Sequence, residues 1–202
     1  MSNSTDRIIL INKPLRWTSF DVVKKLKKPL LEEYRLLFPE EERKLIKRFK
    51  VGHAGTLDPL ATGLLVLCTG KLTKKISEIQ DAEKEYTGTI VIGSTTASYD
   101  LETEPENFQN FDFVTDEMIR TLAKNMEGVQ QQTPPIHSAI KVEGRRAYDM
   151  ARKGIEVELK SREIEIREFE ITRIALPEID FRIVCTKGTY IRSLAQDFGK
   201  KL

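Results

Sequence analysis

Apolar and polar residues alternate along residues 155–186, and this period of two constrains the fold more than any other pattern in the chain. It is clearest from Glu163 to Arg167 (EIEIR) and from Phe181 to Cys185 (FRIVC). Successive side chains of a strand point to opposite faces of a sheet. The pattern therefore predicts an antiparallel sheet with one buried face and one face in water.

Shorter signals place the other elements. We expect strands at residues 7–12, 64–68, 86–93 and 136–142, and helices from residue 18, over 71–80, 115–127 and 145–153, and from 190 onward. Pro29 and Pro39 predict broken helices within residues 24–50. Because no repeat, low-complexity tract or flexible linker occurs, we expect one continuous α+β domain over residues 1–202.

Composition excludes several classes of protein. The 202 residues are 40% hydrophobic and 32% charged, as in a globular domain. No apolar run reaches the roughly 18 residues that span a bilayer. The polar start of the chain (MSNSTDR) lacks a signal-peptide core, so we expect a cytoplasmic protein that does not enter a membrane. Two histidines and the scattered Cys68 and Cys185 predict no metal site.

The small net charge of +2 averages two opposed regions. Residues 24–50 hold ten Lys or Arg against five Glu, whereas residues 85–119 hold no Lys or Arg. The basic stretches at residues 24–50 and 141–153 are candidates to face a polyanion, with a solvated surface as the alternative. The acidic stretch should mostly face away from such a partner.

Residues 51–63 (VGHAGTLDPLATG) are the strongest candidate for chemistry. Their glycines and proline exclude a regular helix or a central strand, so we predict a structured loop. Asp58 lies in this loop beside Pro59, and the glycines let a ligand approach the backbone closely. The alternative is that Asp58 only caps a turn. Other kinds of site are not supported by the sequence. Gly70-Lys71 lacks the remaining residues of a phosphate-binding loop, and no G-x-S-x-G motif of a serine nucleophile occurs. A glycosidase would need a second positioned acid, which is missing.

The string GHAGTLDPLATG resembles the signature of the TruB family of transfer RNA pseudouridine synthases. Further matches follow in order: Lys13-Pro14, Thr18-Ser19, Lys84-x-Tyr86, Asp100, Pro135-x-His137-Ser138-Ala139-x-Lys141, Gly144 to Tyr148, Ala151-Arg152-x-Gly154 and Lys187 to Arg192. The resemblance implies the pseudouridine synthase fold, with a mixed and mostly antiparallel central sheet flanked by helices and loops.

By that resemblance, Asp58 is the catalytic carboxylate of a reaction that detaches uracil from its ribose, rotates it and rejoins it through C5, without cofactor or metal. An aspartate suits this role because its ordinary pKa of about 3.9 keeps it ionised at neutral pH. The resemblance implies substrate-binding roles for six further residues: His53, Tyr86, Asp100, Lys141, Tyr190 and Arg192.

The implied roles of these six residues differ. His53 helps to hold the flipped substrate loop, and Tyr86 stacks on the uracil. Arg192 pairs with Asp58, and Tyr190 and Lys141 line the pocket or its RNA-facing wall. Asp100 matches a family position beside the base. The alternatives are a structural hydrogen bond for His53 and an ordinary strand aromatic for Tyr86.

The resemblance implies a monomeric, stand-alone enzyme that isomerises the T-loop uridine of transfer RNA, conventionally position 55, with the T-stem-loop as its partner. The alternative is a non-catalytic RNA-binding or tRNA-folding protein on the same scaffold. The chain departs from the family pattern in three places. Arg16 stands where the family usually has glycine, residues 24–52 are longer than usual, and Thr96-Ala97-Ser98 loses one acidic side chain. Because the chain stops at Leu202, we expect a catalytic domain truncated at its C-terminal end, without a PUA domain.

Overall fold

The computed structural model describes residues 6–37, 49–138, 140–142, 145–146, 150 and 159–202. Its contacts divide the chain into two compact units, which we call the N-terminal unit (Met1–Ala82) and the C-terminal unit (Glu83–Leu202). Each unit has its own sheet and its own apolar core. The single domain expected over residues 1–202 stays a prediction.

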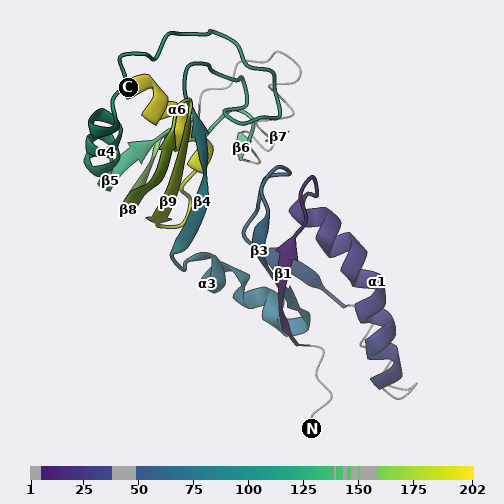
Figure 1. The fold of residues 1–202 in the computed structure, drawn as a ribbon. Helices are drawn as coiled ribbons and strands as arrows, with labels where there is room; N and C mark the ends of the chain where they lie inside the picture. The colour runs from purple at the N-terminus through teal and green to yellow at the C-terminus, as the bar shows by residue number, and fades with distance from the viewer. Residues whose placement is uncertain (1–5, 38–48, 139, 143–144, 147–149, 151–158) are drawn as a thin grey trace. The chain divides into compact units, whose positions relative to one another are not determined.

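The N-terminal unit is built on a three-stranded antiparallel sheet in the order β1-β3-β2 (Figure 1). Its strands are β1 (Ile8–Lys13), β2 (Val51–Ala54) and β3 (Gly63–Thr69). The 3-10 helix η2 (Gly70–Lys75) and helix α3 (Ile76–Gln80) follow β3. The loop predicted over residues 51–63 is thus an edge strand in its first four residues and a loop only from residue 55.

Helix α1 (Ser19–Leu37) packs on this sheet through Val22 and Val23, which share a buried cluster with Leu65 and Leu67 of β3. The Thr18 hydroxyl accepts from the Asp21 N–H at 3.1 Å and caps the helix expected from residue 18.

The break predicted at Pro29 is wrong, because α1 continues through it to Leu37. Proline cannot donate to the carbonyl four residues earlier. The turns beyond Pro29 nevertheless bury the Tyr34 ring completely, and it meets Phe49 edge-to-face with ring centres 4.8 Å apart. This packing offsets the missing helical hydrogen bond, since most helical stability in proteins comes from tertiary contacts.

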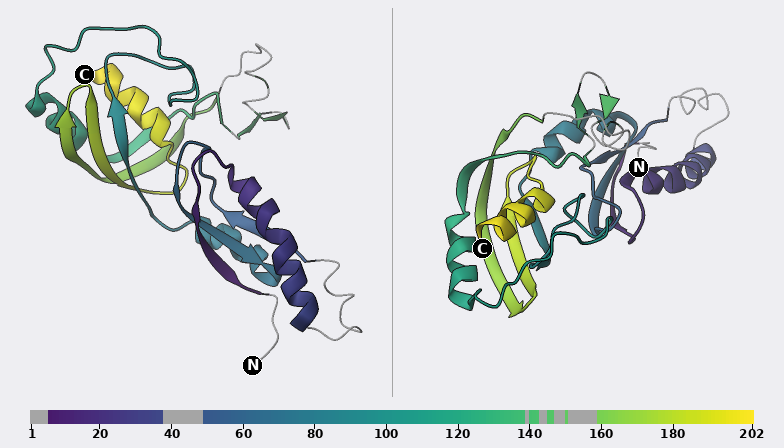
Figure 2. Two further views of the ribbon diagram at one scale, coloured as in Figure 1. Left: turned by 45° about the vertical axis from the view of Figure 1, so that its right-hand side comes forward. Right: turned by 90° about the horizontal axis from the view of Figure 1, so that it is seen from above.

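The C-terminal unit is built on a four-stranded antiparallel sheet in the order β4-β9-β8-β5 (Figure 2). Its strands are β4 (Lys84–Val91), β5 (Gly128–Gln132), β8 (Arg162–Ala175) and β9 (Glu178–Cys185). Helices α4 (Asp116–Asn125) and α6 (Ile191–Lys201) join one apolar core with the sheet, contributing Ile119 and Phe198 respectively. The Thr115 hydroxyl caps α4 by accepting from the Met118 N–H at 3.3 Å.

The opposite face of this sheet carries charged side chains that form ion pairs between neighbouring strands. Arg182 of β9 lies 2.8 Å from Glu85 of β4 and 2.5 Å from Glu168 of β8, and Arg173 lies 2.6 Å from Asp180. One face is therefore apolar and buried and the other is charged and wet, which confirms the prediction from the period of two.

Two predicted elements near residue 140 differ from the structure. Strands β6 (Lys141–Val142) and β7 (Arg145–Arg146) pair as a short antiparallel ladder. The helix predicted over residues 145–153 is wrong at its first two residues, because ladder hydrogen bonds override weak helix propensity; most of its remainder lies outside the described residues. The strand predicted over 136–142 is found only at its end, since the Ser138 N–H donates to the Ile136 carbonyl at 2.9 Å in a tight bend.

Candidate active site

Asp58 lies in the loop between β2 and β3, which we call the Asp58 loop (residues 55–62). The chain leaves β2 through Gly55 at φ +103° and enters β3 at Gly63 with φ +115°. Glycine adopts this left-handed region at no steric cost, whereas other residues rarely do. Within the loop the Asp58 carbonyl accepts from the Ala61 N–H at 3.0 Å. Asp58 itself is half-buried.

The turn between β1 and α1 is hydrogen-bonded to the Asp58 loop. The Arg16 N–H donates to the Pro59 carbonyl at 2.7 Å. The buried Ser19 hydroxyl accepts from the Leu57 N–H at 3.0 Å and donates to the Leu57 carbonyl at 3.3 Å. These bonds hold the backbone on both sides of Asp58.

Lys13 supplies a buried positive charge beside this loop. Its Nζ donates to the carbonyls of Pro14, Trp17 and Pro59 at 3.0, 2.5 and 3.4 Å. Burial lowers the pKa of Lys13, while the negative charge of Asp58 acts in the opposite direction. Lys13 is absent from the site residues predicted from the sequence. The signal that could have found it is a lysine followed by proline at the end of an apolar strand.

Arg16 adopts φ +66°, a left-handed conformation that costs a residue with a side chain about 1–2 kcal/mol. The glycine usual in the family suits this geometry. The turn therefore keeps a backbone conformation favourable to glycine although arginine occupies it.

His53 lies in the edge strand β2, opposite Leu67 of β3. Its Nδ1 donates to the Gly55 carbonyl at 2.5 Å, at the start of the Asp58 loop. The carbonyl oxygen can only accept, so the Nδ1–H of His53 is the donor in this bond. The structural hydrogen bond considered as the alternative for His53 is therefore present. Its role toward RNA stays a prediction.

Arg192 of α6 is the centre of a second cluster, in the C-terminal unit. Its Nε lies 3.6 Å from an Asp100 carboxylate oxygen, and its Nη1 donates to the carbonyls of Ser98 and His137, both at 3.0 Å. The side chains of Arg192 and Asp100 are only 12% and 16% exposed. The Ser98 hydroxyl in turn donates to Asp100 at 2.5 Å, so both charges are held in fixed directions.

The chain around Asp100 is strained. Tyr99 adopts φ +61°, a conformation that few bulky residues take. Such conformations persist only where the surrounding contacts determine them, and they cluster at functional sites. Here the contacts are those that bind Asp100 to Ser98 and Arg192.

Tyr190 begins α6 and is fixed through its backbone. Gln132 of β5 accepts from the Tyr190 N–H at 2.8 Å and donates to the Tyr190 carbonyl at 3.0 Å. The guanidinium of Arg162 stacks on the Tyr190 ring, 4.6 Å from its centre, and also donates to the Gly188 carbonyl. Gln132 and Arg162 therefore position Tyr190, and the sequence motifs do not indicate them, since both lie in ordinary strand patterns.

The two remaining predicted residues lie on strands of the C-terminal unit. Tyr86 of β4 is opposite Ile183 of β9 and packs, half-buried, against the apolar core. Lys141 of β6 is opposite Arg146 of β7.

The structure thus brings the predicted residues together in two groups. Asp58 and His53 belong to one loop and its edge strand in the N-terminal unit, and Arg192 and Asp100 to one cluster in the C-terminal unit. The pairing of Asp58 with Arg192 stays a prediction. Among the described residues, no group of three or more His, Cys, Asp or Glu is arranged to hold a metal ion. In the same part of the chain, no helix is both long enough and apolar enough to cross a bilayer.

Comparison with known proteins shows which family has this sequence and fold. Residues 43–191 match the model of the TruB family pseudouridylate synthase N-terminal domain. The tRNA pseudouridine synthase B of Flavobacterium johnsoniae is 56% identical over 97% of this chain and 82% of that protein. The enzyme of the same name from Parabacteroides distasonis is 51% identical over 96% of this chain and 79% of that protein.

Solved structures with a similar fold are found as well. A Cbf5-Nop10-Gar1 complex contains a chain that superposes with a TM-score of 0.65 and 25% identity, covering 99% of this chain and 45% of that one. An H/ACA RNP bound to a substrate RNA containing 2′-deoxyuridine gives 0.61 and 23%, covering 98% and 43%. The chain therefore spans less than half the length of these structural relatives. The predicted α+β class is confirmed, and the fold is that of the pseudouridine synthases. Within that class, the chain belongs to the TruB family.

Proposed function

We propose that this protein isomerises the T-loop uridine of transfer RNA, conventionally position 55, to pseudouridine, with Asp58 as its catalytic carboxylate. The observation that carries the proposal is the Asp58 loop. It bears the family signature, and the turn between β1 and α1 holds its backbone on both sides of Asp58. The relatives from Flavobacterium johnsoniae and Parabacteroides distasonis are each named tRNA pseudouridine synthase B, which supports transfer RNA as the substrate.

The reaction needs no co-reactant, because the N1–C1′ bond is exchanged for a C5–C1′ bond and one proton moves from C5 to N1. An ionised aspartate can act as a nucleophile toward the sugar or the base, or as a base toward a sugar proton. The uridine must first leave its stack, at a cost of a few kcal/mol.

The other predicted residues have roles in the same proposal. Tyr86 stacks on the flipped uracil, and His53 occupies space that the flipped nucleotide vacates. Arg192 pairs with Asp58 in the bound state, and a guanidinium there keeps a desolvated carboxylate ionised. Asp100 orients Arg192, as its 3.6 Å separation from Nε supports. Lys141 and Tyr190 contact the RNA or the pocket wall.

The test uses an unmodified T-stem-loop RNA that carries tritium at uracil C5. The wild-type protein should release the label, and Asp58→Asn should release none while still binding the RNA. Asp81→Asn, at the exposed end of α3, is the matched control and should release label like the wild type. Binding without release by the wild type would overturn the proposal in favour of a non-catalytic RNA-binding protein.

The proposal includes a monomer that acts alone in the cytoplasm. Light scattering on the purified protein, with and without RNA, measures the mass and tests the monomer. A stable dimer in both conditions would contradict that part.

A further inference from the structure

An open cavity of about 450 Å³ lies at the start of α1, within the N-terminal unit. It is lined by Arg16, Trp17, Asp21, Lys24 and Lys25. Three cationic side chains and one anionic side chain give the wall a net charge of +2, and the indole supplies an aromatic surface. Cations that pair with phosphates, next to a ring on which a base can stack, are the elements of a single-stranded nucleic-acid site.

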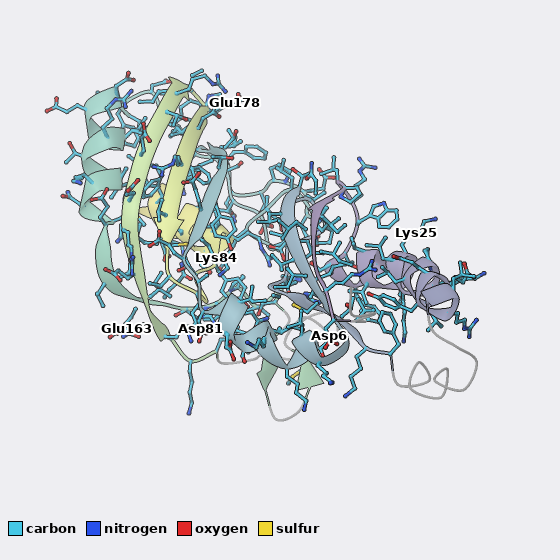
Figure 3. The ribbon with its side chains drawn as sticks, turned by 90° about the horizontal axis from the view of Figure 1, so that it is seen from below. Asp6, Lys25, Asp81, Lys84, Glu163 and Glu178 are labelled. Carbon is cyan, nitrogen blue, oxygen red and sulfur yellow. The ribbon has the colours of Figure 1, made fainter. Side chains whose placement is uncertain are left out.

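The one acidic side chain of this wall is engaged in capping α1. The Asp21 carboxylate accepts from the Thr18 N–H at 3.1 Å and from the Thr18 hydroxyl at 2.5 Å. These hydrogen bonds lower the pKa of Asp21, so it stays ionised, and it lies 3.9 Å from Lys24. Lys25 is exposed on α1 (Figure 3). The cavity thus keeps an excess of positive charge toward solvent.

The cavity wall is bonded to the Asp58 loop. The Arg16 N–H donates to the Pro59 carbonyl, and Pro59 follows Asp58 directly. The Trp17 carbonyl accepts from Lys13 Nζ, which also reaches the Pro59 carbonyl at 3.4 Å. The cavity wall and the Asp58 loop therefore lie next to each other in the N-terminal unit.

We propose that the cavity binds an unstacked nucleotide of the substrate RNA next to the reacting uridine. Its phosphate pairs with Arg16, Lys24 and Lys25, and its base stacks on Trp17. This inference rests on the proposed function and deepens it, because it assigns to α1 a second RNA contact beside the reacting position.

Trp17 is the only tryptophan of the chain, so its fluorescence reports directly on the cavity. The first measurement follows Trp17 emission during titration with unmodified T-stem-loop RNA, while filter retention measures total binding. We expect quenching that saturates together with the retained RNA. Unchanged emission at saturating RNA would overturn the inference.

Two double variants of α1 test the cations. Lys24→Gln/Lys25→Gln removes two wall charges, and Lys27→Gln/Lys28→Gln removes the same charge one turn further along, outside the cavity wall. The pairs are matched, since Lys24 lies 3.9 Å from Asp21 and Lys28 lies 4.0 Å from Glu32.

The Lys24→Gln/Lys25→Gln variant should bind RNA about tenfold more weakly than the wild type. The slope of its log affinity against log salt concentration should be smaller in magnitude by about two. The control variant should lose less than half of that in affinity. Equal losses in both variants would mean that only the net charge of α1 matters, and would overturn the site.

Tritium release by the wild type separates this inference from the proposed function. If the wild type releases tritium but Trp17 emission does not change, or the two double variants lose equal affinity, the cavity site is wrong and the proposed activity stands. If RNA quenches Trp17 emission of the wild type but no tritium is released, the proposed activity is wrong and an RNA site in the cavity remains. A wild type that binds no RNA overturns both.

Discussion

The backbone N–H of Arg16 lies 2.7 Å from the carbonyl oxygen of Pro59 and ties the turn between β1 and α1 to the loop that carries Asp58. The same residue adopts φ +66°, and its side chain lines the cavity at the start of α1. Arg16 thus has a strained backbone, anchors the Asp58 loop and adds a positive charge to the cavity wall. Strain that is retained at such a place is typical of functional sites.

Arg16→Gly should change stability and RNA affinity in opposite directions. Glycine relieves the strain of the left-handed conformation in the folded state. It also raises the conformational entropy of the unfolded chain, which offsets part of this gain. The free energy of unfolding should therefore rise by about 0.5–1 kcal/mol. Losing the guanidinium should weaken RNA binding severalfold. Urea denaturation and filter retention measure the two effects. Arg16→Ala is the control, which should lose affinity without gaining stability. A glycine variant that is less stable than the wild type would contradict this account.

Lys13→Met should destabilise the N-terminal unit by about 1–3 kcal/mol, although methionine fills a similar volume. The substitution leaves the carbonyls of Pro14, Trp17 and Pro59 without the donor they now share. Tritium release should fall more steeply than stability, because the Asp58 loop loses an anchor. Urea denaturation and single-turnover release at saturating RNA separate these effects. Lys74→Met, at an exposed lysine of η2 outside the basic stretches, should alter neither quantity. A fully active Lys13 variant would show that the loop keeps its geometry without this anchor.

Asp100→Asn should impair the cluster around Arg192. The side chain keeps its shape but loses the charge that faces a guanidinium only 12% exposed, which should cost about 1–3 kcal/mol of stability. If Arg192 must keep one direction to meet Asp58, tritium release at saturating RNA should fall at least tenfold. Asp112→Asn, an exposed residue of the same acidic stretch, is the matched control and should behave like the wild type. Release at the wild-type rate by Asp100→Asn would remove Asp100 from the proposed site.

Local patterns predicted most of the framework, because they record the periodicity that burial imposes. The alternation around Phe181 predicted β9, and the helix predicted over residues 115–127 is found as α4, which Thr115 caps. The continuation of α1 through Pro29 was not predictable, since it depends on the contact of Tyr34 with Phe49. The ladder at Arg145 likewise depends on pairing with Val142.

The candidate site divides in the same way. Asp58 stands in a loop whose glycines are visible in the sequence, whereas its anchors are not. Lys13 and Ser19 reach the loop over 46 and 38 residues of sequence, and Gln132 reaches Tyr190 over 58. Hydrogen bonds of this range leave no periodic trace in the residues that make them. The family resemblance marked the candidate residues, and only the fold shows what positions them.

Glu127, between α4 and β5, should make stability depend on acid pH. Its carboxylate accepts from Lys124 Nζ at 2.5 Å and from the Phe169 N–H at 3.1 Å, and these bonds lower its pKa below the ordinary value of 4.5. A carboxyl group with a lowered pKa in the folded state stabilises the fold above the ordinary value and loses that contribution as pH falls through the lowered one. Glu127→Gln should therefore be less stable than wild type at neutral pH by up to about 1 kcal/mol, and the difference should shrink below pH 4.5. Urea midpoints across this range measure it, with the exposed Glu104→Gln as control. A difference that stays constant from neutral to acid pH would show that the charge of Glu127 does not contribute.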